Sequence, residues 1–292
     1  MKTFILAFTL ILAAICNAQD ALRPALEKTY TLWRNALIQK DARVWQMVTA
    51  EHRQGEVRNR IVSEKLPFPA AVFDLPAPPP SLNGLKFLEA KQNGRTAKSA
   101  YFGKVDFGVG GEPTDNLLVL SFVQGTRGWQ YNKADFVNLT ALPEVRKELA
   151  AGDLGYLEGV PEAQPSGVVP PAPIAANPAT TIAKVYVFCP GREVQVQVNK
   201  ISRHRFANAK DADIVIGGAR NGQNEVQYAI KKLEGGTGKE ALTIRVYLMS
   251  EVAGVKPIKA FEYQILENEP FKPFGTGNFV LDQATISKLS GK

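Results

Sequence analysis

Residues 122–136, FVQGTRGWQYNKADF, hold the turn that decides the fold of the N-terminal half of this chain. An apolar run ends at Phe122 and Val123, a glycine-flanked turn follows, and a second run opens with Trp129. Glycines on both sides of a short polar turn between two alternating runs are typical of a β-hairpin. The stretch therefore predicts two neighbouring antiparallel strands.

Upstream of this hairpin the sequence predicts helices and then further strands. An apolar stripe at helical spacing marks a first helix at Leu22, Leu26, Tyr30, Trp33 and Leu37. Alternating runs predict strands at 85–91, 95–107, 117–123 and 129–137, and a short helix is expected at 143–151. Helices followed by an antiparallel meander predict an α+β domain over residues 19–160.

Residues 179–292 predict an all-β domain. Val194, Val196 and Val198 alternate with Gln195 and Gln197, so one face of that strand is buried and the other is wet. Glycine-rich turns separate the alternating runs. Strands are expected at 183–189, 193–200, 213–217, 224–232, 241–249, 258–266 and 278–282.

A proline-rich segment separates the two expected domains. Residues 161–178, PEAQPSGVVPPAPIAANP, contain six prolines and no aromatic residue, a composition that favours an extended, semi-rigid linker. A second proline cluster at 67–80 is interleaved with Phe68, Val72, Phe73 and Leu75. That pattern predicts a loop packed onto the N-terminal domain.

The N-terminal pattern resembles the NTF2-like (SnoaL-like) cone domain over about residues 21–150. The resemblance rests on the long helix, KDARVW at 40–45, the meander, and GTRGWQYNKADF at 125–136. The C-terminal strands resemble an immunoglobulin-like β-sandwich in its broad form, because the Cys…Trp…Cys pattern of antibody domains is missing. The resemblance implies a two-domain protein like those of bacterial envelopes and pili.

Residues 1–18, MKTFILAFTLILAAICNA, have the pattern of a secretory signal peptide. Cleavage after Ala18 would leave Gln19 at the mature N-terminus. The alternative is a lipid anchor on Cys16, although Ile15 is not the small residue that such signals place before the cysteine. No other segment has the apolar length of a transmembrane helix. We expect an exported protein, periplasmic or at the cell surface.

Composition restricts the chemistry. The net charge of +7 becomes +6 when Lys2 is removed with the signal peptide. Positive charge spread this thinly does not indicate a nucleic-acid-binding protein, but it is compatible with binding to an anionic glycan or lipid surface. Cleavage leaves Cys189 as the only cysteine, so no internal disulfide is expected. The two histidines, His52 and His204, lack metal-ligand spacing, and no cofactor motif is present. The sequence does not specify an oligomeric state.

Two sets of residues are candidate sites. Inside a cone, carboxylates and phenols serve as general bases and polarising donors, and the residues of this type are Tyr30, Tyr101, Asp106 and Asp135. The segment NKISRHRFANAK at 199–210 is expected to form a loop and carries a basic cluster of Lys200, Arg203, His204, Arg205 and Lys210. This cluster fits a polyanion contact or a solvated loop.

The sequence therefore predicts an exported, non-catalytic binding or structural protein of the cell envelope, associated with a pilus or secretion apparatus by analogy. The alternative is a cone enzyme, an isomerase, cyclase or hydrolase, that acts on a small hydrophobic molecule. An envelope protein or an anionic glycan or lipid surface is the expected partner. Two converging acidic or phenolic groups in a hollow cone would favour the enzyme.

Overall fold

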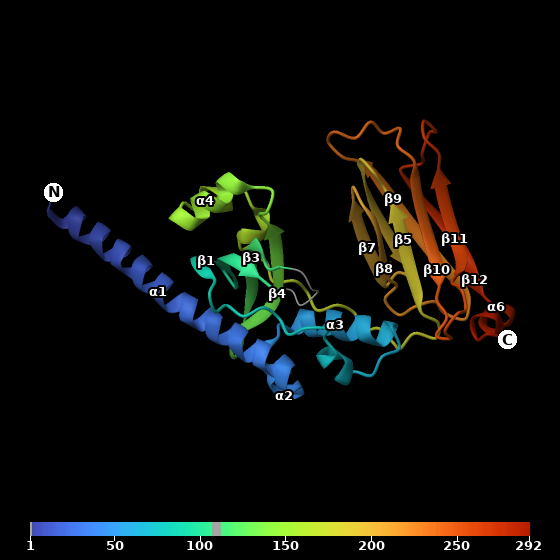
Figure 1. Cartoon of the computed structure of the whole chain (residues 1–292), viewed down its shortest axis with the longest axis horizontal. Coiled ribbons are helices and arrows are strands. Elements are labelled where there is room, and N and C mark those ends of the chain that lie inside the picture. The colour runs from blue at the N-terminus through green and yellow to red at the C-terminus, as the bar shows by residue number, and fades with distance from the viewer. Residues whose placement is uncertain (1, 107–111) are drawn as a thin grey trace. The chain divides into compact units, whose positions relative to one another are not determined.

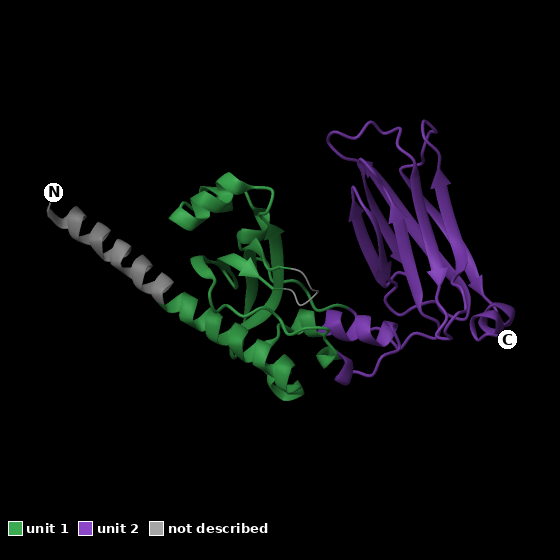
Figure 2. Cartoon of the chain, viewed as in Figure 1, with its two compact units in different colours: residues 1–54, 72–173 green, residues 55–71, 174–292 purple. Residues whose placement is uncertain are grey.

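The computed structural model describes residues 2–106 and 112–292, with side chains from residue 21 onward. The chain is rich in β-structure, with three four-stranded antiparallel sheets and most of its helices in the N-terminal half (Figure 1). It divides into two compact units, shown in Figure 2. The first comprises residues 1–54 and 72–173, and the second comprises residues 55–71 and 174–292.

The first unit is a β-meander with helices on both faces. Its sheet has the strand order β1-β2-β3-β4. Its elements are α1 (Lys2–Gln39), α2 (Ala42–Val48), β1 (Lys86–Asn93), β2 (Thr96–Val105), β3 (Thr114–Gly125), β4 (Gly128–Asn138), α4 (Pro143–Ala151), α5 (Gly155–Glu158) and η2 (Pro161–Ala163). The expected strands and the helix at 143–151 are confirmed where they fall within the described residues; residue 107 lies outside them.

The hairpin that organises the sheet forms as its glycines predict. Gly125 pairs with Gly128, which leaves Thr126 and Arg127 as the two turn residues. Gly128 has a φ of +109°, a conformation that side chains with a Cβ rarely adopt. A Cβ on Gly125 would lie only 2.5 Å from the Gln130 side chain. The local backbone therefore requires glycine at Gly128, whereas a side chain at Gly125 would only displace the end of the Gln130 side chain.

The two faces of this sheet bury different kinds of side chain. We call the side that packs on α1 the aromatic face; its buried residues are Leu22, Leu26, Tyr30, Ala90, Ala97, Tyr101, Leu118, Leu120, Phe122 and Tyr131. The opposite face packs mostly aliphatic residues against α4, α5 and η2. Alternation along β3 sends Leu118, Leu120 and Phe122 to one face and Leu117 and Val119 to the other.

The proline-rich segment 161–178 is packed for part of its length. Ala163 is buried with the opposite face, and the Gly167 N–H donates to the Thr96 Oγ1 at 2.8 Å. Ala176 is buried in the second unit. The division between the units falls inside this segment, after residue 173, because its two ends pack on different units.

The second unit includes a helical segment that the sequence suggests for the first domain. From Gly55 onward, α3 (Glu51–Ser63) belongs to the second unit. The Asn59 Oδ1 accepts the Ala176 N–H at 2.8 Å, and the Ser63 Oγ accepts the Gly217 N–H at 2.8 Å. These hydrogen bonds join residues far apart in sequence, which explains why composition alone does not reveal them.

The second unit contains two four-stranded sheets over one core. We call them the β5 sheet, in the order β11-β10-β5-β8, and the β6 sheet, in the order β12-β9-β6-β7. The elements are β5 (Ala183–Phe188), β6 (Arg192–Val198), β7 (Ser202–Ala207), β8 (Lys210–Ile214), β9 (Gly222–Lys232), β10 (Leu242–Leu248), β11 (Ile258–Ile265), β12 (Phe274–Leu281) and α6 (Gln283–Leu289).

One strand of this unit was not predicted. The stretch 199–210 was expected to be a loop, but Ser202–Ala207 forms β7, paired with β6 in a hairpin. Asn199 and Lys200 make its turn, both with positive φ. Within β7, Ser202 and His204 occupy buried positions that usually hold apolar residues. Polar residues at the inward positions conceal the alternation on which sequence prediction depends.

Candidate functional site

The two candidate tyrosines lie together in the aromatic face. Tyr30 and Tyr101 are almost fully buried. The Tyr30 hydroxyl donates to the Pro80 carbonyl oxygen at 2.7 Å, and the Tyr101 hydroxyl donates to the Glu27 Oε1 at 3.3 Å. Burial raises the pKa of both phenols above their ordinary range. Both hydroxyls are neutral donors with partners already in place.

Aromatic rings occupy the space between α1 and the sheet in this region. The ring centroids of Trp33 and Tyr131 are 3.9 Å apart, and those of Tyr30 and Tyr131 are 5.6 Å apart. Phe122 packs against Tyr131 edge-on at 6.0 Å. Trp129 is only partly buried at the margin of this cluster. These rings therefore pack closely around Tyr30, while a hollow of about 710 Å³ is lined by Glu27 and Phe87.

The two candidate aspartates do not join the tyrosines. Asp135 lies on β4 beside Val119, hence on the opposite face of the sheet, and forms an ion pair with Lys133 at 2.8 Å. Asp106 is exposed and directly precedes residues outside the described part of the chain. The structure therefore brings together Tyr30 and Tyr101 and separates them from Asp135.

A serine–lysine pair that the sequence did not suggest lies near Asp135. The Lys98 Nζ donates to the Ser121 Oγ at 2.7 Å across β2 and β3. Burial lowers the pKa of Lys98, and the Asp135 carboxylate, 3.9 Å away, acts against that shift. Ser121 is only 3% exposed, although it and Lys98 both line a hollow of about 350 Å³ beside Glu162. We interpret the pair as cross-strand packing.

The basic cluster at 199–210 is divided among different surfaces. Arg203 and Arg205 point outward from the β6 sheet, whereas Lys210 begins β8 at the edge of the β5 sheet. The Arg205 guanidinium donates to the Glu193 carboxylate at 2.6 Å and lowers its pKa. Lys200 is exposed in the hairpin turn, and His204 is buried. These five residues do not make one patch.

His204 instead belongs to a buried hydrogen-bond network. The Ser202 Oγ lies 2.6 Å from the His204 Nε2, and the His204 Nδ1 lies 3.2 Å from the Asp213 Oδ2. This order of serine, histidine and aspartate is that of a hydrolase triad. The network joins β7 to β8, the edge strands of the two sheets.

Burial and hydrogen bonding prevent this network from acting as a nucleophilic triad. Ser202 is 0% exposed, and its Oγ already accepts the Ile216 N–H at 2.7 Å. The hydrogen bond from His204 lowers the pKa of Asp213, which keeps that carboxylate ionised. A buried serine that cannot meet a carbonyl carbon has a structural role. The network connects the two sheets along one edge.

The outer side of the β5 sheet carries aromatic and basic side chains. The core takes Val185 and Val187 from β5, so Lys184, Tyr186 and Phe188 point outward. On β10 the outward positions are Thr243, Arg245 and Tyr247, on the same pattern. The residues of this surface are Lys184, Tyr186, Phe188, Lys210, Arg245, Tyr247 and Lys259.

Aromatic and cationic residues alternate across this face. The strand register places Tyr247 between Lys184 and Lys259, and Tyr186 beside Arg245. Phe188 lies opposite Lys210. Glu262 pairs with Arg245 and Lys259, whereas Lys184 and Lys210 make no ion pair with the residues that the structure describes. The result is a net positive sheet surface with partly exposed rings.

The remaining residues that could carry chemistry, His52 and Cys189, are buried. His52 is 4% exposed, and its Nε2 is hydrogen-bonded to the Asn132 Oδ1 at 2.8 Å. Cys189 is a buried core residue, and burial raises its thiol pKa. Among the described residues, no group of three potential metal ligands converges. No described helix has both the length and the apolar character needed to cross a bilayer.

Comparison with known proteins gives no assignment. No family model matches the chain, and no curated protein matches it. A solved structure of two domains of Extended-Synaptotagmin 2 is 9% identical and covers 62% of this chain and 77% of that chain. Its TM-score of 0.14 is too low to support an argument about fold or function.

Proposed function

We propose that this chain is an exported, non-catalytic binding protein of the cell envelope. It would hold an acidic glycan through the aromatic and basic surface of the β5 sheet, which we call the glycan face. The observation that carries the proposal is that Tyr247 and Phe188 lie beside Lys184 and Lys210, two lysines that make no ion pair with the described residues. The groups that resemble catalytic residues are buried and engaged in hydrogen bonds, which also favours binding over chemistry.

The physical basis is stacking combined with charge. The apolar faces of sugar rings pack on aromatic side chains, which are rigid and lose little entropy on binding. Ammonium groups between the rings attract the carboxylates or sulfates of an acidic chain, and several exposed cations acting together exceed a single surface ion pair. Neutral glycans would use only the first interaction, so they should bind more weakly.

The finer fold assignment is part of the same proposal. We propose an NTF2-like cone for the first unit, supported by α1 packing on a four-stranded meander. We propose an immunoglobulin-like sandwich for the second unit only in the broad sense of architecture. The β6–β9 and β10–β11 pairs correspond to the B–E and F–G strand pairs of an immunoglobulin domain. The first strand of the unit departs from that pattern, because β5 pairs with β10 rather than with β6. A pilus or secretion partner remains an analogy.

The alternative enzyme is less well supported. It requires an accessible base near a polarising donor. Tyr30 and Tyr101 are buried and hydrogen-bonded, and Asp135 lies on the other face of the sheet. Conversion of a small hydrophobic substrate that is lost in a Tyr101→Phe variant of unchanged stability would restore this alternative.

The proposal is tested by titrating the mature protein with polygalacturonate, a carboxylated polysaccharide, and with neutral dextran in a calorimeter. We expect binding to polygalacturonate that weakens as salt rises, because exposed charges are screened over about 8–10 Å. A Tyr186→Ala/Tyr247→Ala variant should bind at least about tenfold more weakly. Equal binding to dextran, or no binding to polygalacturonate, would contradict the proposal.

Export is tested separately by the mass of the protein recovered from its producing cells. Signal-peptide cleavage predicts a chain that begins at Gln19, whereas a lipid anchor predicts a chain that begins at Cys16 with acyl groups attached. A chain that retains Met1 and remains in the cytoplasm would contradict an envelope role even if polysaccharide binds in vitro.

A further inference from the structure

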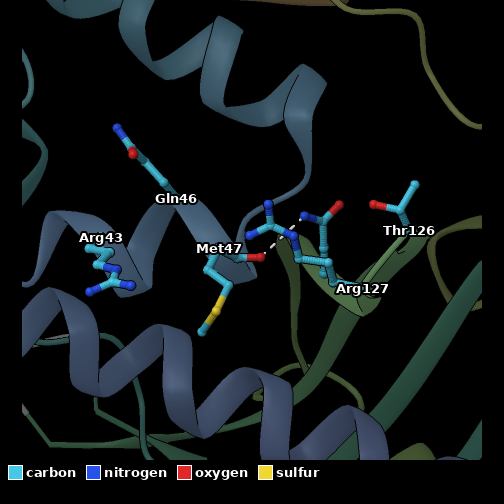
Figure 3. A pocket seen from close by; sticks show the side chains of 6 residues that line it. Arg43, Gln46, Met47, Thr126 and Arg127 are labelled. Atoms are coloured by element: carbon cyan, nitrogen blue, oxygen red, sulfur yellow. Dashed lines mark hydrogen bonds between the residues drawn. The ribbon is translucent and has the colours of Figure 1, made fainter.

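The first unit has a pocket that is independent of the glycan face. It lies between α2 and the β3–β4 turn and has a volume of about 420 Å³ (Figure 3). Its lining residues are Arg43, Gln46, Met47, Thr126, Arg127 and Gln130. The glycine-flanked hairpin that decides the fold thus also forms one wall of this pocket.

Local geometry explains why these side chains meet. Arg43, Gln46 and Met47 are spaced i, i+3 and i+4, so they share one face of α2. Thr126 and Arg127 are the two turn residues of the hairpin. Figure 3 shows Arg43, Gln46 and Met47 on the helix and Thr126 and Arg127 on the turn beside it.

Two hydrogen bonds hold the end of α2 against β4. The Gln130 Nε2 donates to the Met47 carbonyl oxygen at 3.2 Å, drawn as the dashed line in Figure 3. The Ala50 N–H donates to the Tyr131 carbonyl oxygen at 2.8 Å. Because the Met47 carbonyl already has a partner, the negative end of α2 is partly neutralised.

The charges of this pocket are unbalanced. Neither Arg43 nor Arg127 makes an ion pair with any residue of the described chain. The amides of Gln46 and Gln130 and the hydroxyl of Thr126 are neutral groups able to bond an oxyanion. Two guanidinium groups without acidic partners, on fixed walls, favour a ligand with two negative charges.

We propose that this pocket binds a phosphomonoester whose substituent is partly apolar. A phosphomonoester carries about 1.5 to 2 negative charges near pH 7, which matches two guanidinium groups. Met47 is 44% exposed and offers an apolar surface beside them. The phosphate can belong to a soluble ester or to a lipid headgroup, and the same side chains would recognise either.

The test uses two phosphate sources and matched variants of the full mature protein. Glycerol 3-phosphate is titrated by calorimetry, and flotation is measured with phosphatidylcholine vesicles with and without phosphatidic acid. An Arg43→Gln/Arg127→Gln variant should bind at least about tenfold more weakly to whichever source the wild type binds. An Arg43→Lys/Arg127→Lys variant should lose part of the affinity, because ammonium groups lack the guanidinium fork.

A Lys28→Gln/Lys104→Gln variant is the control, since it removes two exposed positive charges of the same unit outside the pocket. It should bind like the wild type. Absence of binding to both sources, or an equal loss in the control variant, would overturn the proposal. Neither result affects the glycan face, whose residues belong to the second unit.

Discussion

The two units place polar side chains in their interiors for different purposes. In the first unit, buried tyrosines fill one face of a sheet, and their hydroxyls donate to Glu27 or the Pro80 carbonyl. In the second unit the core is mostly aliphatic, and a polar network through Ser202, His204 and Asp213 connects the edges of two sheets. Residues of catalytic type are structural in both.

The same comparison holds for the surfaces, where each unit exposes cations without acidic partners among the described residues. In the first unit these include Arg43 and Arg127 in a pocket, and in the second they include Lys184 and Lys210 on the outer side of a sheet. Because a pocket suits a compact anion and a flat sheet suits an extended chain, the two surfaces should recognise different ligands. Both proposals concern binding rather than chemistry.

The largest predicted effect tests whether residues 55–71 belong to the second unit. A fragment of residues 174–292 lacks the hydrogen bonds made by Asn59, Val62 and Ser63 and the burial of Val62. At about 1 kcal/mol per hydrogen bond plus the apolar term, it should lose roughly 5 kcal/mol of unfolding free energy. Denaturation of that fragment with and without a peptide of residues 51–71 measures this. A fragment stable without the peptide would contradict this description of the second unit.

The next effect tests the aromatic face of the first unit. Phe122 is 1% exposed at the centre of the ring cluster, so Phe122→Ala should cost about 3–5 kcal/mol of unfolding free energy. Trp129 is only partly buried, so Trp129→Ala should cost less. Urea denaturation compares the two variants. A larger loss for Trp129→Ala would contradict the packing.

A smaller effect tests the network of the second unit. His204→Ala leaves the Ser202 hydroxyl and the Asp213 carboxylate without their shared partner, so it should cost about 1–3 kcal/mol. A catalytic role predicts lost activity instead, with little change in stability. Thermal unfolding of the wild type and His204→Ala separates the two interpretations, and unchanged stability would contradict the structural one.

The pH dependence of that network has a definite sign. His204 lowers the folded-state pKa of Asp213, so the unfolded chain binds this proton more readily. The stabilising contribution is therefore complete above an unfolded pKa of about 3.9 and is lost as pH falls through the lower folded value. The difference in unfolding free energy between the wild type and Asp213→Asn should shrink below about pH 4. A difference that grows with acidity would contradict the assignment.

Sequence reasoning predicted the regular elements better than the sites. The glycines at 125 and 128 and the apolar alternation of β3 specify the hairpin locally, and the structure has it. The second-unit role of α3 depends on long-range hydrogen bonds, and β7 hides its alternation behind Ser202 and His204. The basic cluster was grouped by closeness in sequence, whereas strand pairing distributes its members over two sheets.

The glycan face shows what sequence could have revealed. In AKVYVFC, the outward positions of the strand are Lys184, Tyr186 and Phe188, and aromatic residues at exposed strand positions are a signal for binding. The pairing of this strand with β8 and β10 needs the topology, so the neighbouring Lys210 and Tyr247 were not predictable from spacing.

The most direct test compares two pairs of cations in the second unit at equal net charge. Mature wild type, Lys184→Gln/Lys210→Gln and Arg203→Gln/Arg205→Gln are eluted from a column of immobilised heparin, a sulfated acidic polysaccharide, with a salt gradient. We predict that the lysine variant elutes at distinctly lower salt, while the arginine variant elutes near the wild type because Arg203 and Arg205 lie on the other sheet and Glu193 already neutralises Arg205. Wild type in the flow-through, or a larger shift for the arginine variant, would contradict binding through the glycan face.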